Sequence, residues 1–585
     1  MSSVDFSDIQ PIGTVLRVDT TQVVIEVEDH EVVPSLQVGG LAAVQGEIST
    51  KFLIGVIDSV SRDIASLEWP AEAPISDEWD IETAYTEQRD VVRLVLIGTY
   101  YSSVGERINQ FRRGADSFPS VARPCWSIEG QNLKVLMEGL VQSVDRDKRL
   151  VLGHLLADSN VNAVADGDSL FQRHCAIVGS TGSGKSWTTA LLLEQAEKLP
   201  YANIVVLDVH GEYASLASQQ SEDQDFYRVL RLAGKGMEAG EKEELLHIPH
   251  WFLNSEELQA LLLDRTDHNA PNQTSRLMHH VRELKAQSIK KLTYFSDEEH
   301  FTVDSPIPFG IQDLIGCLRA DDTQMVPGKR EEKQGEFYGK LTRFIARLET
   351  RIGDGRLAFM FDAPTPTPAE DWLAQWANTL LCADDHSPGI KIIDLSQVPS
   401  DLIPLITGVL GRLILEIQFW RSPQTRTPVV LICDEADLYI SSSSDIGSEA
   451  RRAVGVFERI AKEGRKYGTS LVIVSQRPAE VNRTLLSQVS NFIVLRLTND
   501  TDRAAIRSLL PDSMFGLIHS LQLMDVGEAV VVGDAMILPS RIRLHEPKKK
   551  PGSSTYAVWS DWTSKPSLEQ CVGEAIVRMR RQRRD

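Results

Sequence analysis

A glycine-rich loop between two apolar segments is the first group of residues whose spacing could do chemistry. Gly179 is followed by four residues and then by Gly184, Lys185 and Ser186, which is the spacing of a phosphate-binding loop. Glycine lets the backbone curl until its N–H groups point at phosphate oxygens, while the lysine would reach the terminal phosphates and the serine would hold Mg²⁺. CAIV before the loop predicts a buried strand, and WTTALLLEQAEKL after it predicts a helix. A flexible surface loop would lack such flanks. The pattern therefore indicates nucleotide binding by Gly179, Thr181, Gly182, Ser183, Gly184, Lys185, Ser186 and Trp187.

An acidic pair at the end of a second apolar strand could complete a hydrolytic site. In VVLICDE an apolar run precedes Asp434 and Glu435. Asp434 would orient Mg²⁺ through water, and Glu435 would polarise the attacking water as general base. An acidic pair that merely caps a strand is the competing interpretation, and the glycine-rich loop upstream favours the catalytic one.

A glutamine and a basic helix supply a third element. Gln476 follows the predicted strand 469–475, at the edge where open α/β sheets bind ligands, and could sense the γ-phosphate. The segment 457–468, between the acidic pair and this strand, carries the basic residues Arg459, Lys462, Arg465 and Lys466. An arginine placed against transition-state charge accelerates phosphoryl transfer by about 10³–10⁵. One of them could serve a neighbouring subunit; a solvated helix face stays open as the alternative.

Strands that alternate with helices must position these groups. From about residue 165 the pattern predicts strands at 175–179, 203–208, 390–395, 428–435, 469–475 and 491–497. This alternation is typical of a mostly parallel α/β sheet. Residues 215–385 contain three segments with helical apolar spacing, SEELQALLL, SRLMHHVRELKAQSIKKL and GKLTRFIARLETRI, and predict a helical subdomain inserted in the core. GEAVVVGDAMILPSRIRLHEP predicts a closing hairpin.

The amino-terminal part of the chain predicts a different, β-rich domain. TVLRVDTTQVVIEVED contains two alternating runs around a polar turn, and further strands are predicted at 52–60, 91–100 and 133–141. Many short strands suggest a small barrel with a β connector, and the acidic segment 68–82 is an excursion or boundary. The predicted domains are 1–155 (barrel and connector), 156–214 (first part of the core), 215–385 (helical insertion), 386–545 (second part of the core) and 546–585 (carboxyl-terminal extension).

The composition of the 585 residues, with 42% hydrophobic and 24% charged, is that of an ordinary globular protein. We recognise neither a secretory signal nor a run of about eighteen apolar residues, and therefore expect a cytoplasmic protein without a membrane span. Six scattered cysteines, of which Cys175 and Cys433 lie in predicted buried strands, indicate reduced thiols rather than disulfides or a zinc site. His279 and His280 are expected to lie on the surface of a helix, and a metal-binding role is the alternative.

The net charge of −21 limits how the chain could meet nucleic acid. Nucleic acid would need a local basic surface, such as the inside of a ring. The tail VRMRRQRRD carries five arginines between Arg578 and Arg584. It predicts a solvated, disordered end, with contact to phosphates or to an acidic partner as the alternative. KKKPGSS before it predicts a mobile segment.

Four motifs together resemble the HerA branch of the HerA–FtsK ATPases: RHCAIVGSTGSGKS, VVLDVHGEY, LICDEAD and IAKEGRKYGTSLVIVSQRP, in the family's order. The amino-terminal β region is similar to the family's barrel, the HAS-barrel, named for its likeness to the barrel of rotary ATP synthases. The insertion and the closing hairpin also fall where HerA proteins carry them. The resemblance implies an α/β fold with a RecA-like P-loop ATPase core, an N-terminal β-barrel and an inserted helical subdomain, with ATP and Mg²⁺ as cofactors.

The resemblance also implies roles by position. The phosphate and magnesium residues, the catalytic pair and the sensor are Lys185, Ser186, Asp434, Glu435 and Gln476. Arg173 matches an arginine that HerA proteins bring to the nucleotide within the same subunit, and Asp208 and Glu212 match acidic residues that face the site. The trans-acting finger would be Arg459 or Arg465, and both stay open.

Two further residues of these motifs have smaller implied roles. His210 is expected to be structural. Asp437 stands where the family often has histidine, so that DEAD replaces DEAH. This departure leaves the acidic pair untouched, and it does not indicate the RNA helicases named for those letters, whose two tandem cores are absent.

The function implied is an ATP-dependent translocase or helicase of double-stranded DNA, working as a homohexamer with ATP at subunit interfaces and DNA in the pore. HerA proteins work with a nuclease such as NurA in DNA end processing, and in bacteria with nuclease or sirtuin-like NADase effectors in antiviral defence. The sequence holds no nuclease or NADase constellation, so such activity would come from a partner. The alternative is an assembly platform that positions an effector, with ATP turnover secondary. A conjugation or secretion pump usually brings a membrane segment or another amino-terminal domain, and neither is recognisable.

Overall fold

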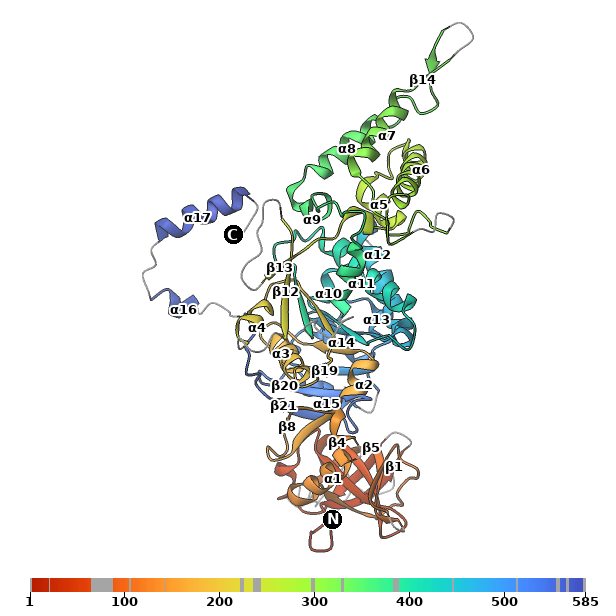
Figure 1. Cartoon of the computed structure of the whole chain (residues 1–585). Coiled ribbons are helices and arrows are strands. Elements are labelled where there is room, and N and C mark those ends of the chain that lie inside the picture. The colour runs from red at the N-terminus through yellow and green to blue at the C-terminus, as the bar shows by residue number, and fades with distance from the viewer. Residues whose placement is uncertain are drawn as a thin grey trace, which may run out of the picture. The chain divides into compact units, whose positions relative to one another are not determined.

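The chain folds into two compact units, whose elements are labelled in Figure 1. Unit 1 comprises Met1–Leu191, Gln476–Ala479 and Val489–Glu546; unit 2 comprises Leu192–Ser475, Glu480–Gln488 and Pro547–Asp585. Helix α3 (Lys185–Ala196) begins in unit 1 and ends in unit 2. The structure, a computed structural model, describes residues 3–19, 22–64, 88–104, 107–142, 144–220, 226–234, 243–295, 300–327, 331–381, 389–443, 447–511, 514–553, 558–563 and 568–581.

Six strands of unit 1 close into a barrel in the order β2-β1-β7-β3-β4-β5, and β2 pairs with β5 to complete the ring. Alternate side chains point inward and form its core, including Val15, Ile25, Leu53 and Leu94, each at most 1% exposed. The predicted β-rich amino-terminal region is thereby confirmed. The barrel strands are β1 (Gly13–Val18), β2 (Val23–Val27), β3 (Leu41–Gln45), β4 (Lys51–Ile64), β5 (Gln88–Val104) and β7 (Pro124–Ser127).

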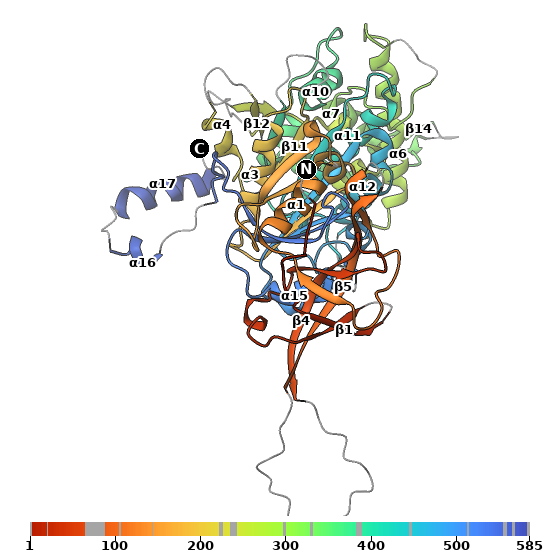
Figure 2. The same cartoon turned by 90° about the horizontal axis from the view of Figure 1, so that it is seen from below.

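Strands β4 and β5 are much longer than their neighbours. They pair as an antiparallel ribbon as far as Ile64 and Gln88, and Figure 2 shows this ribbon projecting from the barrel. Strand β6 (Arg107–Arg113) pairs with the other end of β5. The predicted excursion 68–82 lies outside the described residues.

The predicted strand 133–141 is wrong, because these residues form helix α1 (Gly130–Gln142). Its buried residues Leu133, Leu136, Met137 and Leu140 repeat at the spacing i, i+3, i+4, i+7, which places them on one face of a helix. The apolar run LKVLM hides this spacing, since a short apolar run fits a strand or a helix equally well.

The sheet of unit 1 contains the strand that precedes the glycine-rich loop. Strand β10 pairs in parallel with β19, and β20, β21, β8 and β9 continue the sheet with antiparallel pairings. The β20–β21 hairpin is the predicted closing hairpin. The elements are β8 (Arg149–Leu155), β9 (Asn162–Asp166), α2 (Gly167–Gln172), β10 (Cys175–Val178), β19 (Asn491–Val494), α14 (Asp500–Arg507), α15 (Phe515–Ser520), β20 (Glu528–Gly533) and β21 (Ser540–Leu544).

Unit 2 contains six parallel strands in the order β13-β12-β16-β11-β17-β18. Four of them confirm predicted strands: β11 (Ile204–Asp208), β16 (Ile390–Asp394), β17 (Val429–Cys433) and β18 (Thr469–Ser475). The other two, β12 (Tyr227–Leu232) and β13 (Glu243–Leu246), come from the segment 215–385, which was expected to form a helical subdomain. That segment therefore extends the sheet before it forms helices.

Helices make up most of the remaining insertion. Figure 1 draws α6, α7 and α8 close together, with the β14–β15 hairpin beyond α7. The helix bounds are α5 (Ser255–Leu262), α6 (Ala270–Ile289), α7 (Ile311–Thr323), α8 (Thr342–Ile352), α9 (Ala358–Phe361) and α10 (Trp372–Leu381), and the hairpin is β14 (Met325–Val326) with β15 (Lys333–Gln334). The other helices of unit 2 are α4 (Ala214–Ser218), α11 (Ile403–Trp420), α12 (Ser448–Glu463), α13 (Arg483–Leu486), α16 (Val558–Asp561) and α17 (Leu568–Arg581).

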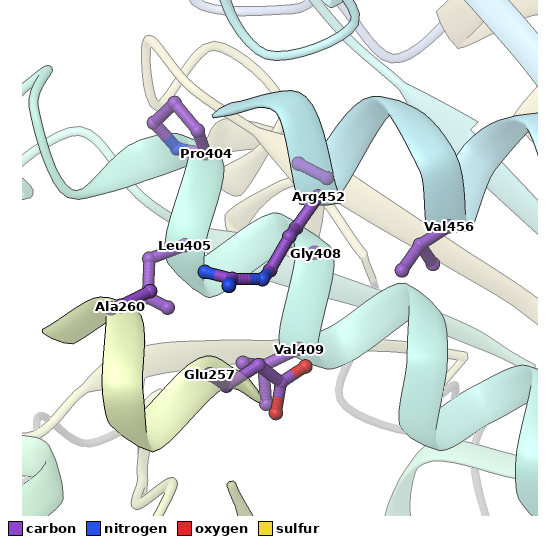
Figure 3. A pocket seen from close by; sticks show the side chains of 9 residues that line it. Glu257, Ala260, Pro404, Leu405, Gly408, Val409, Arg452 and Val456 are labelled. Atoms are coloured by element: carbon purple, nitrogen blue, oxygen red, sulfur yellow. The ribbon is translucent and has the colours of Figure 1, made fainter. Parts of the chain in front are cut away.

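Helix α5 of the insertion packs on α11 and α12 of the core. Figure 3 shows Glu257 of α5 beside Gly408 and Val409 of α11, with Arg452 of α12 across the same pocket. Helices α11 and α12 approach closely because a Cβ at Gly408 would lie 3.2 Å from Ala453. Arg412 of α11, largely buried, donates from Nε and Nη2 to the two carboxylate oxygens of Glu257, both at 2.7 Å. A bidentate ion pair therefore ties the insertion to the core.

Helix α11 is also long and apolar enough to cross a membrane by length and composition, with a mean hydropathy of 1.4 over 18 residues. Of this 18-residue window, 72% is buried inside the fold, which is typical of a core helix that is hydrophobic all round.

Cys175 and Cys433 lie in buried strands, β10 and β17, as predicted. Cys125, Cys175, Cys317 and Cys433 form no disulfide, and three of them are fully buried. Burial raises the pKa of the Cys175 thiol to about 12, which suits an inert core thiol. Cys382 and the side chain of Cys571 lie outside the described residues.

Candidate functional site

The glycine-rich loop connects β10 to α3 and lies wholly in unit 1. Gly182 and Gly184 have φ of +73° and +110°, a region that residues with a Cβ rarely adopt. At Gly179, a Cβ would lie 2.5 Å from Ser183 Oγ and 2.7 Å from Leu495 Cβ. The glycines at these three positions are therefore required by the path of the backbone.

The polar groups of the loop are arranged so that they could bind an anion. Lys185 is 7% exposed, and its Nζ donates to the carbonyl oxygen of Ser180 at 3.4 Å. Ser183 Oγ is buried and makes no hydrogen bond. Because α3 begins at Lys185, its free N–H groups and its dipole face the loop. The loop has the form of a phosphate cradle.

Gln476 is brought to this loop. It directly follows β18 along the chain, and its Oε1 accepts a hydrogen bond from Thr181 Oγ1 at 2.5 Å. Ser180 Oγ on the other side of the loop accepts from the backbone N–H of Thr498 at 3.1 Å. The predicted sensor therefore contacts the predicted phosphate loop.

Arg173 lies just before β10, separated from it by His174, whose φ is +57°. Its guanidinium pairs with the carboxylate of Asp534, in the turn of the closing hairpin, and is 42% exposed. Asp534 also faces Arg113 at 3.5 Å. Its role at the nucleotide stays a prediction.

The carboxylates form the second group, in unit 2. Strands β11 and β17 pair in parallel, with Leu207 opposite Cys433, so Asp208 and Asp434 emerge side by side at the carboxyl edge of the sheet. Burial, with Asp394 beside it, raises the pKa of Asp208 to about 7. Burial first, and then the neighbouring Asp208 and Glu435, raise the pKa of Asp434 well above its usual range. A divalent cation at this edge would relieve that repulsion.

Glu435 has an unusual backbone. Its φ and ψ are +45° and 49°, a left-handed conformation that costs a residue with a Cβ about 1–3 kcal/mol and that clusters at functional sites. The residue is 8% exposed, and its Oε1 lies 4.0 Å from His210 Nε2. Strand β17 ends at Cys433, so the acidic pair stands just beyond the strand rather than inside it.

Asp208 stabilises a backbone turn, a role that was not predicted from the sequence. Its buried carboxylate accepts backbone N–H groups of Gly211, Glu212 and Tyr213 at 2.8, 3.0 and 2.9 Å. It closes the turn of the DVHGEY motif. The expectation that Asp208 and Glu212 face a nucleotide stays a prediction.

Sequence reasoning also missed residues that support the acidic pair. Tyr213 and Tyr439, both fully buried, donate to Asp434, and Ser475 Oγ donates to Asp437 Oδ1 at 2.6 Å. This hydrogen bond fixes Asp437 against the end of β18. It explains why aspartate fits at position 437, where HerA proteins often have histidine. The tyrosines directly after each strand-end motif were the available signal.

The two finger candidates lie on α12 and in the turn that follows it. Arg459, near the end of α12, pairs with Glu463 at 3.4 Å, and Arg465 lies exposed in the 3₁₀ turn Gly464–Tyr467 that leads into the start of β18. The start of β18 is the amino edge of a parallel sheet, whereas Glu435 follows the carboxyl end of β17. The structure therefore does not bring Arg465 to Glu435 of the same chain.

Among the described residues, no group of three or more histidine, cysteine or acidic side chains is arranged to hold a metal alone. His280 Nε2 instead contacts Asp321 Oδ2 at 2.6 Å, an ordinary pair between helices α6 and α7. Mg²⁺ keeps several waters and binds through one or two protein oxygens plus phosphates. The hydroxyl of Ser186 and the carboxylate of Asp434 are oxygen ligands of that kind, and the acid set fits a hard cation.

The carboxyl-terminal extension lies beside the DVHGEY turn. Lys549 Nζ donates to both oxygens of Glu197 at 2.8 and 2.9 Å, and the N–H of Gly552 donates to the carbonyl of Glu212 at 2.7 Å. The predicted mobility of KKKPGSS is therefore wrong for its lysines and Gly552. The predicted disorder of the tail is wrong as far as α17, whose described side chains are nevertheless exposed; residues 582–585 lie outside the described residues.

The chain is similar to a helicase family model and to several helicases. The family model "Helicase HerA, central domain" matches residues 150–414. A probable helicase of Methanocaldococcus jannaschii is 25% identical over 410 residues, 69% of this chain and 68% of that protein. The DNA double-strand break repair helicase HerA of Saccharolobus solfataricus is 24% identical over 433 residues, 73% of each chain, and that of Pyrococcus furiosus is 22% identical over 462 residues, 73% and 74%.

Solved structures with a partial likeness include VirB4 and a bacterial conjugative coupling protein. VirB4 of Thermoanaerobacter pseudethanolicus covers 69% of this chain and 98% of its own, with 17% identity and a TM-score of 0.44. The bacterial conjugative coupling protein TrwB covers 73% and 94%, with 14% identity and a TM-score of 0.42.

Proposed function

We propose that this chain is an ATPase of the HerA helicase type, on its likeness to the HerA central domain and to HerA helicases over about 73% of its length, and that it hydrolyses ATP to move along double-stranded DNA. The observation that carries the proposal is the glycine-built loop, with Gln476 bonded to Thr181, at the start of a helix. This arrangement holds phosphates through backbone N–H groups and one buried lysine.

We infer that the loop and the acidic pair act on one ATP. Lys185 neutralises charge on the terminal phosphates, and the N–H groups of Gly182 to Lys185 hold their oxygens. Glu435 accepts the proton of the attacking water, and Gln476 senses the γ-phosphate. Mg²⁺, when bound by Ser186 and Asp434, offsets phosphate charge. The loop motif favours contacts of Thr181 and Trp187 with the nucleotide, and the resemblance to HerA proteins implies that Arg173, Asp208 and Glu212 border it.

Placement of Arg465 at the amino edge of the sheet supports a subunit interface. An arginine on the edge opposite the acidic pair of its own chain would serve an ATP on a neighbouring copy, as a ring with interfacial ATP requires. Arg459 remains the alternative finger. We propose a cytoplasmic homohexamer with DNA in its pore, since a ring lets the outer shell carry the charge of −21.

Purified wild type and Lys185→Ala test the ATPase. Removing a single preorganised charge-stabilising group typically costs about 10²–10³ in kcat, so we expect the variant to lose turnover. Undiminished turnover would overturn the site assignment. Duplex DNA should stimulate the wild type, and added salt should weaken the stimulation because phosphate contacts release counterions. A rate that is flat across DNA and salt would contradict translocation.

A partner effector, a NurA-type or other nuclease or a sirtuin-like NADase, belongs to the same proposal, for DNA end processing or antiviral defence. The alternative is an assembly platform. Glu435→Gln separates the two, because it should keep ATP binding and the ring while stopping hydrolysis. If effector function survives in this variant, the motor proposal fails. Co-purification followed by mass spectrometry would identify the effector.

A further inference from the structure

Tyr213 is a fully buried residue that links two strand ends of the acidic edge. Its backbone N–H donates to Asp208 Oδ2 at 2.9 Å, and its side-chain hydroxyl donates to Asp434 Oδ1 at 3.3 Å. Asp208 ends β11, and Asp434 directly follows β17, the neighbouring strand. One residue thus connects the DVHGEY turn to the acidic pair.

The turn that carries Tyr213 leaves the ring little freedom. The carboxylate of Asp208 holds three successive N–H groups, and Gly211 has a φ of +74°. A Cβ at Gly211 would lie 3.1 Å from Ser396 Cβ, so the turn is also packed against the segment after β16. The fixed turn and the full burial of the side chain together limit where the hydroxyl can lie.

Asp434 is fixed at its backbone by separate contacts. Its N–H donates to the carbonyl of Leu207 at 3.3 Å, and its carbonyl accepts from the hydroxyl of Tyr439 at 3.0 Å. The hydrogen bond from Tyr213 goes instead to the carboxylate. Since a hydroxyl donates only one hydrogen, it orients Oδ1 and leaves the second oxygen available.

We propose that Tyr213 is a positioning residue that orients the carboxylate of Asp434 for magnesium-dependent ATP hydrolysis. The inference rests on the proposed function. Hydrogen bonds to a metal-binding side chain fix its orientation, and their loss typically costs 10–100-fold in metal affinity or activity. Tyr213→Phe removes the hydroxyl and keeps the ring, so that packing is preserved.

The experiment measures ATPase rate against free Mg²⁺ at saturating ATP for wild type, Tyr213→Phe and Tyr439→Phe. Tyr439→Phe is the matched control, because it removes an equally buried hydroxyl that bonds to the backbone of the same aspartate. We expect the Mg²⁺ concentration for half-maximal rate to rise about tenfold in Tyr213→Phe only. High Mg²⁺ should restore its rate, which it could not do for an unfolded site, and melting temperatures confirm that each variant folds.

An unshifted Mg²⁺ curve in Tyr213→Phe, or an equal shift in both variants, would overturn the proposal. So would a loss of rate that high Mg²⁺ does not restore. A wild type without magnesium-dependent turnover would instead refute the proposed function, so the two failures are distinguishable.

Discussion

Replacing Arg412 by methionine would test whether a buried ion pair holds the helical insertion to the ATPase core. The guanidinium donates to both oxygens of Glu257 at 2.7 Å and to the carbonyl of Phe252 at 2.8 Å, and both charged residues are less than 9% exposed. Methionine keeps much of the side-chain volume but removes every donor. It leaves the carboxylate of Glu257 buried without its counter-ion.

The expected cost follows from that geometry. Breaking a buried pair by removing one partner destabilises by about 3–5 kcal/mol, because the remaining charge is uncompensated. Glu257 keeps the N–H of Asn254 through its capping box, at 2.9 Å, which favours the lower end of the range. Since about 1.4 kcal/mol is a factor of ten, local opening of α5 should become roughly a hundredfold to a thousandfold more frequent.

Hydrogen exchange measured by mass spectrometry on peptides covering α5 reports this opening directly. A single global unfolding free energy is unsuitable for a chain of two units. Glu416→Gln is the control: Glu416 also pairs with Arg412, at 2.8 Å, but is 40% exposed, and exposed pairs contribute only about 0.2–1 kcal/mol.

Exchange of α5 in Arg412→Met no faster than in Glu416→Gln would refute the reasoning. A double variant, Glu257→Met with Arg412→Met, should recover protection, because apolar replacement of a whole buried pair is often neutral or stabilising. Faster exchange in the double variant than in the single one would also contradict the ion-pair account.

Two further outcomes follow from the structure. Gly179→Ala should weaken binding of a fluorescent ATP analogue at least tenfold, because the added Cβ would overlap Ser183 and Leu495. The control Gly316→Ala, whose Cβ would meet open space, should bind the analogue normally. Equal binding by both variants would contradict the loop geometry. The hydrogen bond from Arg62, joined by one from His30 and opposed by burial, lowers the pKa of Asp90 to about 2. The stabilisation by ionised Asp90 is fully present above the ordinary aspartate pKa of about 3.9 and is lost as pH falls through about 2. The difference in melting temperature between wild type and Asp90→Asn should therefore disappear over this pH range. A difference that stays constant would contradict the prediction.

The sequence predicted the parts of the fold that short-range patterns encode. The glycine loop before α3 and the strands β10, β11, β16, β17, β18 and β19 were all recognisable from apolar runs and their flanks. The same approach failed for α1, whose apolar run fits either period, and for β12 and β13 in the expected helical insertion. A short apolar segment does not indicate which strand or helix it will pack against.

Residue identity and spacing alone determined the chemistry available: a lysine and a serine after a curled glycine loop, and an acidic pair after a buried strand. Only the tertiary structure decided which groups meet. It paired β11 with β17 so that Tyr213 reaches Asp434, bonded Thr181 to Gln476 and gave Asp208 a turn to close. The physical reason is that glycine curvature and apolar period act over a few residues, whereas contacts between residues hundreds of positions apart depend on strand register and on the packing of the whole core.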